Sequence, residues 1–403
     1  MTTSASYDLI IVGAGMAGSA AAIELGARGH RVLLVDKARF PRDKACGEGL
    51  MPAAVDHLAR LGVLDALHAA GARPVRGIRY HNRRQARAEA DFPSGGAGAP
   101  WAGLALRRLV LDDVLIARAR AEPTVEVREG FRVTAAEVEG DTVVGVRGRD
   151  DDVAGVERRF TAPLTLGADG HLSIFHGQLG IQRQSFRRRR YGVSGHFAGV
   201  AGLEDYVEVY LGDEAEAYLA PVGPDTALVA LLVEARAMPS FAGRLDSRYE
   251  ELARCFPALG ARLRASRLLP PVSAVGPLGF RVRPLTHNGL MLIGDSAGFI
   301  DPVTGEGMSL ALKSVAAAVP VIDRAFRQRD FSRQVLAEYE TRRRHALRDV
   351  RLLTHLVLAM AGRPALADRA IAVLARHRGL FTRLLAVAGG RRSLIQALFA
   401  PLA

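Results

Sequence analysis

A glycine-rich turn near the N-terminus constrains the fold of this chain more than any other segment. The stretch Gly13-Ala14-Gly15-Met16-Ala17-Gly18 follows an apolar run at 7–12 and leads into small and apolar residues that suit a helix packed closely on a sheet. A second apolar run, 31–35, ends at Asp36, 23 residues after Gly13. This order predicts a βαβ unit that binds a dinucleotide, with the pyrophosphate at the helix N-terminus and a ribose at Asp36.

The residues of this turn have separate parts in the prediction. Gly13 permits the tight turn, Gly15 lets the backbone approach the pyrophosphate, and Gly18 lets helix and strand pack closely. Met16 and Ala17 complete the set of cofactor-binding candidates in the turn. The basic residues that follow Asp36 are further candidates, with a solvated surface as the alternative: Lys37, Arg42 and Lys44. No second turn of this kind follows, so a protein with separate flavin and nicotinamide domains is not expected.

Composition excludes several other classes of protein. The chain has 403 residues, of which 49% are hydrophobic and 24% charged, enough for two or three domains. It has no apolar run of ~20 residues and no signal-peptide pattern, so we expect a cytoplasmic protein without a spanning helix. The net charge of +12 comes almost entirely from arginine. Without a nucleic-acid-binding motif, this charge favours an anionic membrane surface over nucleic acid as a partner. Cys46 and Cys255 have no metal-ligand spacing, so no metal site is expected.

Two later segments complete the pattern. Gly167-Ala168-Asp169-Gly170 follows the short apolar run 164–166, and Gly294-Asp295-Ser296-Ala297 follows another at 290–293. Asp301-Pro302-Val303-Thr304-Gly305-Glu306-Gly307-Met308 then leads into a helix of small residues. The segment 294–297 suits the hydroxyl groups of a sugar-alcohol chain. FAD offers both a pyrophosphate and a ribityl chain, so it is the dinucleotide that we predict.

With these motifs in this order, the chain resembles the single-component flavoprotein monooxygenases of the p-hydroxybenzoate hydroxylase superfamily, and in particular the geranylgeranyl-reductase-like branch. The resemblance covers residues 6 to about 330. It implies that Asp295, with Gly294, holds the ribityl chain, and that Asp169 and Gly170 lie near the pyrophosphate. For Asp169, a helix cap is the alternative. The resemblance also implies a set of residues that line the isoalloxazine ring: Pro302, Gly305, Gly307 and Met308.

The resemblance also implies an arginine that contacts FAD, four residues before an aspartate in the helix after residue 108. That spacing to Asp112 selects Arg108 over its neighbour Arg107, although the two are hard to separate by sequence. The segment Cys46-Gly47-Glu48-Gly49 resembles the loop that faces the flavin in prenyl reductases, with Glu48 in place of the usual glycine. Tyr218 lies where relatives carry aromatic residues over the substrate pocket.

Three residues are therefore candidates for catalysis, each with a structural alternative: Cys46 as a buried thiol, Glu48 as a hydrogen-bond acceptor for a loop, and Tyr218 as a packing residue. His196 is a further pocket candidate, although a histidine in the core or on the surface is the more common case. The run Arg187–Arg190 predicts a solvated strand edge, with a docking patch for an anion as the alternative.

The predicted fold class is α/β, with a Rossmann-like FAD-binding domain, an inserted antiparallel β-sheet substrate domain and a C-terminal helical extension. The FAD-binding domain comprises 1–75, 105–180 and 281–330, the substrate domain 76–104 and 181–280, and the extension 331–403. An apolar stripe in the extension (Leu352, Leu353, Leu356, Val357 and Met360) either packs over the substrate domain or contacts a membrane surface. The oligomeric state is not predicted.

The resemblance implies an FAD-dependent monooxygenase driven by NAD(P)H. It would hydroxylate or epoxidise a hydrophobic aromatic or polyene small molecule in secondary metabolism. The alternative is a flavin-dependent reductase of prenyl or polyene double bonds, of the geranylgeranyl reductase type. A lipid-binding escort without enzymatic activity is a third possibility, but this chain keeps every flavin motif. Halogenation is not expected, because the halogenase signature uses two tryptophans and Trp101 is the only one here.

Overall fold

The computed structural model describes residues 7–84, 86–93, 102–152 and 156–399. A six-stranded sheet carries the N-terminal motif and has the strand order β18-β19-β12-β1-β2-β8. All neighbours in it are parallel except β18 and β19. The strands are β1 (Leu9–Val12), β2 (Val32–Val35), β8 (Val125–Arg128), β12 (Leu164–Gly167), β18 (Thr286–His287) and β19 (Leu290–Leu292).

Helices connect and cover this sheet. The helices α1 (Met16–Gly26), α4 (Arg108–Arg120) and α8 (Gly307–Gln328) pack with α1 between the other two. The alternation of apolar and polar residues over 125–149 is typical of one β-meander, but the structure divides this stretch between two sheets. β8 pairs with β2, whereas β9 (Phe131–Glu139) and β10 (Thr142–Asp150) form a separate antiparallel sheet with β11 (Glu157–Thr161). Alternation reports one buried face and does not identify the pairing partner.

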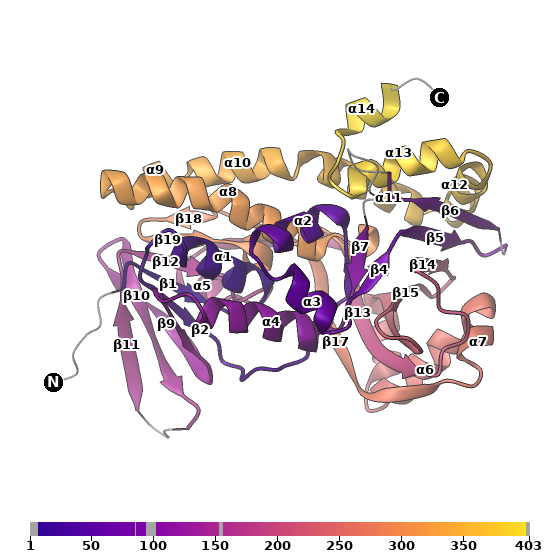
Figure 1. The fold of residues 1–403 in the computed structure, drawn as a ribbon, viewed down its shortest axis with the longest axis horizontal. Coiled ribbons are helices and arrows are strands. Elements are labelled where there is room, and N and C mark those ends of the chain that lie inside the picture. Colours follow the sequence, from indigo (N-terminus) through magenta and orange to yellow (C-terminus); the bar gives the residue numbers. More distant parts are fainter. Residues whose placement is uncertain (1–6, 85, 94–101, 153–155, 400–403) are drawn as a thin grey trace.

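A seven-stranded sheet forms the second layer, with the order β17-β13-β16-β15-β14-β5-β6. Its neighbours are antiparallel except β14 and β5. Two of its strands precede α4 in the chain and five follow it, as an insertion requires. The strands are β5 (Gly77–His81), β6 (Arg87–Asp91), β13 (Gln182–Ala198), β14 (Tyr206–Leu211), β15 (Ala215–Pro221), β16 (Thr226–Glu234) and β17 (Arg267–Arg283). Figure 1 shows this sheet beside the parallel one, with α6 (Leu245–Arg254) and α7 (Pro257–Leu263) on its outer side.

The junction between the two sheets contains shorter elements. Apolar residues in 51–67 recur at helical spacing and predict one helix. The structure has two, α2 (Pro52–Arg60) and α3 (Leu64–Ala69), because Gly62 between them has a φ of +71°. A small sheet of β3 (Gly49–Leu50), β7 (Gly103–Ala105) and β4 (Arg73–Val75) lies next to α2. The remaining short elements carry the motif residues: α5 (Ile174–Gln178), η3 (Gly294–Ala297) and η4 (Pro302–Thr304).

The C-terminal chain is helical throughout its described part. Its helices are α9 (Arg333–Leu336), α10 (Glu338–Ala346), α11 (Arg348–Ala361), α12 (Pro364–Arg376), α13 (Arg378–Ala388) and α14 (Leu394–Phe399). α10 packs on α8, and α12 and α13 pack on β6 of the seven-stranded sheet (Figure 1). Within the described part of the chain, no helix has the length and apolar character needed to cross a membrane. The fold is therefore the predicted α/β class with an inserted sheet and a helical extension.

Candidate functional site

The three motif segments meet around the N-terminus of α1. Gly13 has a φ of +101°, and a Cβ there would lie 2.5 Å from the carbonyl oxygen of Ala168. A Cβ on Gly18 would lie 1.7 Å from the carbonyl oxygen of Gly13, and one on Gly294 would lie 2.8 Å from the Cβ of Ala17. These contacts leave no room for a side chain, so glycine is required at each position. The turn, 167–170 and 294–297 thus form one continuous surface.

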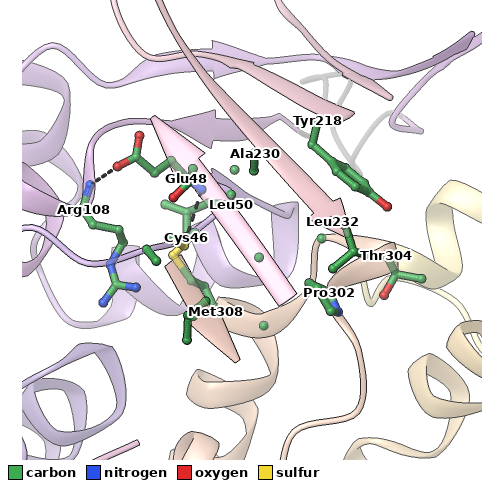
Figure 2. Close-up of a pocket in the computed structure, with 18 of the residues that line it drawn as sticks. Cys46, Glu48, Leu50, Arg108, Tyr218, Ala230, Leu232, Pro302, Thr304 and Met308 are labelled. Carbon is green, nitrogen blue, oxygen red and sulfur yellow. Dashed lines mark hydrogen bonds between the residues drawn. The ribbon is translucent and has the colours of Figure 1, made fainter. Parts of the chain in front are cut away.

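A pocket extends from this surface to the seven-stranded sheet. It brings together most of the sequence-predicted residues: Gly15, Met16, Ala17, Lys44, Cys46, Glu48, Arg108, Gly170, Tyr218, Asp295, Pro302, Gly305, Gly307 and Met308. Figure 2 shows Cys46, Glu48 and Met308 on one side of this pocket and Tyr218, above Pro302 and Thr304, on the other. The remaining predicted residues lie outside its lining: Gly13, Gly18, Asp36, Lys37, Asp169 and Gly294.

The carboxylate of Asp36 stabilises the turn itself. Its two oxygens accept hydrogen bonds from the backbone N–H groups of Ala14, at 2.7 Å, and Ala38, at 2.8 Å. Asp36 therefore has a local role beside the predicted ribose contact. Lys37 is exposed.

Cationic side chains surround the start of α1. Arg42 Nη1 lies 3.0 Å from Asp112 Oδ2, and its Nη2 lies 3.5 Å from the Cβ position of Gly15. The Nζ of Lys44 lies 3.8 Å from the Cβ position of Gly170. Together with the helix N-terminus, these charges suit a diphosphate.

The structure separates Arg108 from Arg107. Arg108 is buried, lines the pocket and binds the Asp112 carboxylate through Nε at 3.0 Å and Nη2 at 2.7 Å. Burial lowers the pKa of Arg108, but Asp112 and the Cys46 thiol outweigh it, so the pKa is raised overall and the guanidinium stays charged. Arg107 instead pairs with Asp43 at 3.0 Å and does not line the pocket. Arg108 is thus the arginine placed to contact a cofactor.

Glu48 links the flavin-side loop to the substrate sheet. Its side chain is 1% exposed, and its Oε1 accepts a hydrogen bond from the backbone N–H of Arg108 at 2.8 Å (Figure 2). Its Oε2 lies 2.8 Å from Nε2 of His196, which is buried on β13. The φ of Glu48 is +55°, a conformation that costs a non-glycine residue ~1–2 kcal/mol. Glu48 therefore has the structural role of a hydrogen-bond acceptor for a loop, and His196 is its second hydrogen-bond partner.

A buried charge network lies at the other end of the pocket. Arg190 is 2% exposed and bonds to Asp301 Oδ2 through Nε at 3.0 Å and to Glu216 Oε1 through Nη1 at 3.1 Å. Its Nη2 also bonds to Asp301. Glu216 Oε2 in turn accepts from the Tyr218 hydroxyl at 2.7 Å, and that hydroxyl lies 3.4 Å from the carbonyl oxygen of Val303.

This network corrects the expectation of a solvated edge for Arg190; the side chains of Arg187 and Arg188 lie outside the described residues. Arg189 is exposed as expected, but Arg190 is buried because two carboxylates compensate its charge. The sequence could not identify these partners, since Asp301 lies 111 residues further along the chain. Burial raises the pKa of Tyr218 well above its usual value, and Glu216 adds to this effect, so the hydroxyl remains a protonated donor to Glu216.

In the motif segments of the described chain, Asp169 and Glu306 have buried carboxyl oxygens without a hydrogen-bond partner. Asp169 Oδ2 accepts from the backbone N–H of Ile174 at 2.9 Å, which is a capping role at α5. Its Oδ1 is buried without a hydrogen-bond partner in the described residues, and burial raises the pKa of Asp169. Both carboxyl oxygens of Glu306 are likewise buried and unpartnered there. Burial raises the pKa of Glu306 to about 8, with Lys313 acting in the opposite direction.

The residues present fit FAD. The glycine turn allows close backbone approach, Arg42, Lys44 and the start of α1 suit the diphosphate, and Asp295 faces the pocket between these groups and the ring-lining segment 302–308. Fold and site together define a flavin-binding oxidoreductase.

Comparison with known proteins gives the family. The model of the FAD binding domain family matches residues 6–351, and the chain belongs to this family of p-hydroxybenzoate hydroxylase-like flavoproteins. The chain is 32% identical over 323 residues to menaquinone reductase of Mycolicibacterium smegmatis, covering 76% of this chain and 74% of that protein. It is 28% identical over 322 residues to squalene monooxygenase of Mus musculus, covering 76% of this chain and 53% of that protein.

Solved structures agree on the fold. A flavin-dependent brominase superposes with a TM-score of 0.82 at 21% identity, covering 96% of this chain and 94% of that chain. A geranylgeranyl bacteriochlorophyll reductase-like protein from Thermoplasma acidophilum gives a TM-score of 0.76 at 22% identity, with 92% and 91% covered. At these identities the likeness concerns the fold alone.

Proposed function

We propose that the protein is an FAD-dependent, NAD(P)H-driven monooxygenase that hydroxylates or epoxidises a hydrophobic aromatic or polyene small molecule in secondary metabolism. The observation that carries this proposal is the wall of the pocket that the seven-stranded sheet contributes. It consists mainly of apolar side chains from the seven-stranded sheet and its neighbours: Val193, Val207, Val209, Ala230, Leu232, Val275 and Leu278. Such a wall excludes water and suits an apolar substrate.

The redox chemistry would come from bound FAD: two electrons from NAD(P)H and one O₂ yield an oxygenated substrate and water. The chain supplies binding and charge control. Arg42 and Lys44 would offset the diphosphate charge, and Asp295 would accept hydrogen bonds from the ribityl chain. The 22-residue helix α8 begins in the segment expected to line the ring, so its positive end would stabilise negative charge there.

The second candidate is reduction of a prenyl or polyene double bond with the same cofactor. Cys46 supports it, since the thiol lies in the pocket lining together with Met308 and Glu48. The similarity to menaquinone reductases supports it as well.

Membrane contact through the C-terminal helices belongs to the same proposal. Leu352 and Leu356 on α11 and Ile395 on α14 are exposed, whereas Leu353 of the same stripe is buried. These exposed apolar side chains, with the arginines of α11 and α12, would let the enzyme take a lipophilic substrate from a membrane surface.

Oxygen dependence tests the choice between the two reactions. The FAD-loaded protein is incubated with NADPH and a panel of polyenes and aromatics, with and without O₂, and the products are identified by mass. A product that carries one added oxygen and requires O₂ supports monooxygenation. A product with two added hydrogens that forms without O₂ overturns it in favour of the reductase.

A further inference from the structure

One row of side chains crosses five strands of the seven-stranded sheet. The strand register pairs Ser194 with Ala230, Ala230 with Tyr218, Tyr218 with Val209, and Val209 with Tyr80. All five residues line the pocket. Because neighbouring strands lie ~4.8 Å apart, the four steps from Ser194 to Tyr80 span about 19 Å. This wall of the pocket is therefore long in the direction across the strands.

The three hydroxyl groups in this row differ in their hydrogen bonding. The Tyr218 hydroxyl is already engaged, since it donates to Glu216 at 2.7 Å. For Tyr80 and Ser194, the described part of the chain provides no hydrogen-bond partner to the hydroxyl. Burial raises the pKa of Tyr80 to about 12, with a smaller contribution from Glu216, so its hydroxyl is protonated at neutral pH. Tyr80 thus lines the pocket with a donor for which the described residues offer no acceptor.

The two ends of the row lie in different surroundings. Ser194 is two residues from His196, which contacts Glu48, so this end lies beside the segment 46–48. Tyr80 lies at the opposite end, where its ring packs against Phe381 of α13 with centroids 5.8 Å apart. Tyr80 packs against an apolar cluster that includes Val75, Ile78 and Phe92, and the Glu216 carboxylate is the charged group near it. A hydrogen-bond donor in such surroundings gains most from a ligand that brings an acceptor to it.

We propose that Tyr80 determines specificity by donating a hydrogen bond to a polar oxygen of an elongated, otherwise apolar substrate that lies along the row 194–230–218–209–80. The chemical class is a polyprenyl or polyene chain with a carbonyl or ether oxygen at one end. The chain portion passes Ala230 and Val209, and the end away from Tyr80 reaches the segment 46–48. The position of the reacting end rests on the proposed function, whereas the binding role of Tyr80 does not.

The test uses two probes and the FAD-loaded protein, with binding followed by the change in flavin absorption. Phylloquinone carries a polyprenyl chain and two carbonyl oxygens, whereas squalene is a hydrocarbon of comparable extension. Tyr80→Phe is expected to weaken phylloquinone binding about 5- to 10-fold, the loss of one hydrogen bond, and to leave squalene binding unchanged. Tyr191→Phe is the matched control, since Tyr191 lies on β13 outside the pocket lining and its loss should affect neither probe.

A second variant tests the row itself. Ala230→Leu fills the middle of the row and should weaken binding of both probes at unchanged FAD content. The proposal would be overturned if Tyr80→Phe bound phylloquinone as tightly as the wild type does. It would also be overturned if Tyr80→Phe lost the same affinity for both probes, or if the wild-type protein bound neither probe. The assay involves no turnover, so these outcomes are independent of the oxygen experiment that tests the proposed function.

Discussion

The guanidinium of Arg190 forms an ion pair with the carboxylate of Asp301, with Nε 3.0 Å from Oδ2. This contact ties β13 of the substrate sheet to the residue that precedes the ring-lining segment 302–308. Asp301 also caps η4 by accepting from the backbone N–H of Val303 at 3.0 Å. The position of the substrate sheet and the position of the cofactor segment are therefore set by the same buried contact.

Removing the cation from this contact should be costly. Arg190→Met leaves the buried carboxylates of Asp301 and Glu216 without their partner, so we expect a loss of about 3–5 kcal/mol in the free energy of unfolding. Urea denaturation at constant FAD measures it. Arg189→Met, at the exposed neighbour, should change stability by less than about 0.5 kcal/mol. In the double variant Arg190→Met/Asp301→Asn, part of the lost stability should be recovered. A change of less than about 0.5 kcal/mol in Arg190→Met would show that the network does not stabilise the fold.

The stability of the protein should fall as the pH rises through the range in which Glu306 titrates. Burial raises the pKa of its carboxyl from 4.5 to about 8, so the unfolded chain gives up this proton at lower pH than the folded protein. The folded state then binds more protons, and its stability declines between about pH 4.5 and 8. Glu306→Gln, which keeps the neutral shape, should flatten this part of the profile. Thermal melts from pH 4.5 to 9 measure both proteins, and parallel profiles would contradict the assignment.

The two ends of the cofactor site should respond differently to loss of a carboxylate. Asp295→Ala should lower FAD retention strongly with little change in apoprotein stability, since Asp295 faces the pocket. Asp36→Ala should lower FAD affinity and also destabilise the apoprotein by about 1–3 kcal/mol, because two backbone N–H groups lose their acceptor. FAD titration and apoprotein melts separate these effects. Unchanged flavin content in Asp295→Ala would remove its assignment to the ribityl chain.

Glu48 should act mainly through its hydrogen bonds. Glu48→Gln keeps an acceptor for the Arg108 N–H and a group that can bond to His196, so turnover within about threefold of the wild type is expected, with an unchanged pH profile. Glu48→Ala leaves both partners unsatisfied and should cost about 1–3 kcal/mol in stability. A loss of turnover of a hundredfold or more in the glutamine variant, without loss of FAD, would identify Glu48 as a proton donor instead.

The parts of this protein that the sequence predicts are those whose cause is local. Gly13 is dictated by its positive φ and Gly18 by its contact with Gly13 within the turn, so the βαβ unit and its place in the fold follow from spacing. The break between α2 and α3 at Gly62 and the separation of β8 from β9 do not follow from spacing, because an apolar pattern does not specify which strand or helix packs against it.

The remaining site contacts depend on the assembled fold. His196 and Glu48 are 148 residues apart, and Arg190 and Asp301 are 111 apart. Nothing in the sequence around one residue of each pair identifies the other residue as its partner. The buried state of Arg190 exists because two carboxylates from β15 and the 301 loop surround it, and an arginine run in the sequence more often marks a solvated edge.

One extended cofactor is proposed to bind with its nucleotide end at residues 13–18 and its ring end at 294–308. Titration of the apoprotein with FAD, FMN and riboflavin, followed by flavin fluorescence, tests it most directly. We predict one FAD per chain, bound at least tenfold more tightly than FMN, because FMN lacks the AMP half, whose phosphate would approach Gly15 and whose ribose would bind Asp36. Equal affinity for FMN and FAD, or no flavin binding at all, would contradict the account.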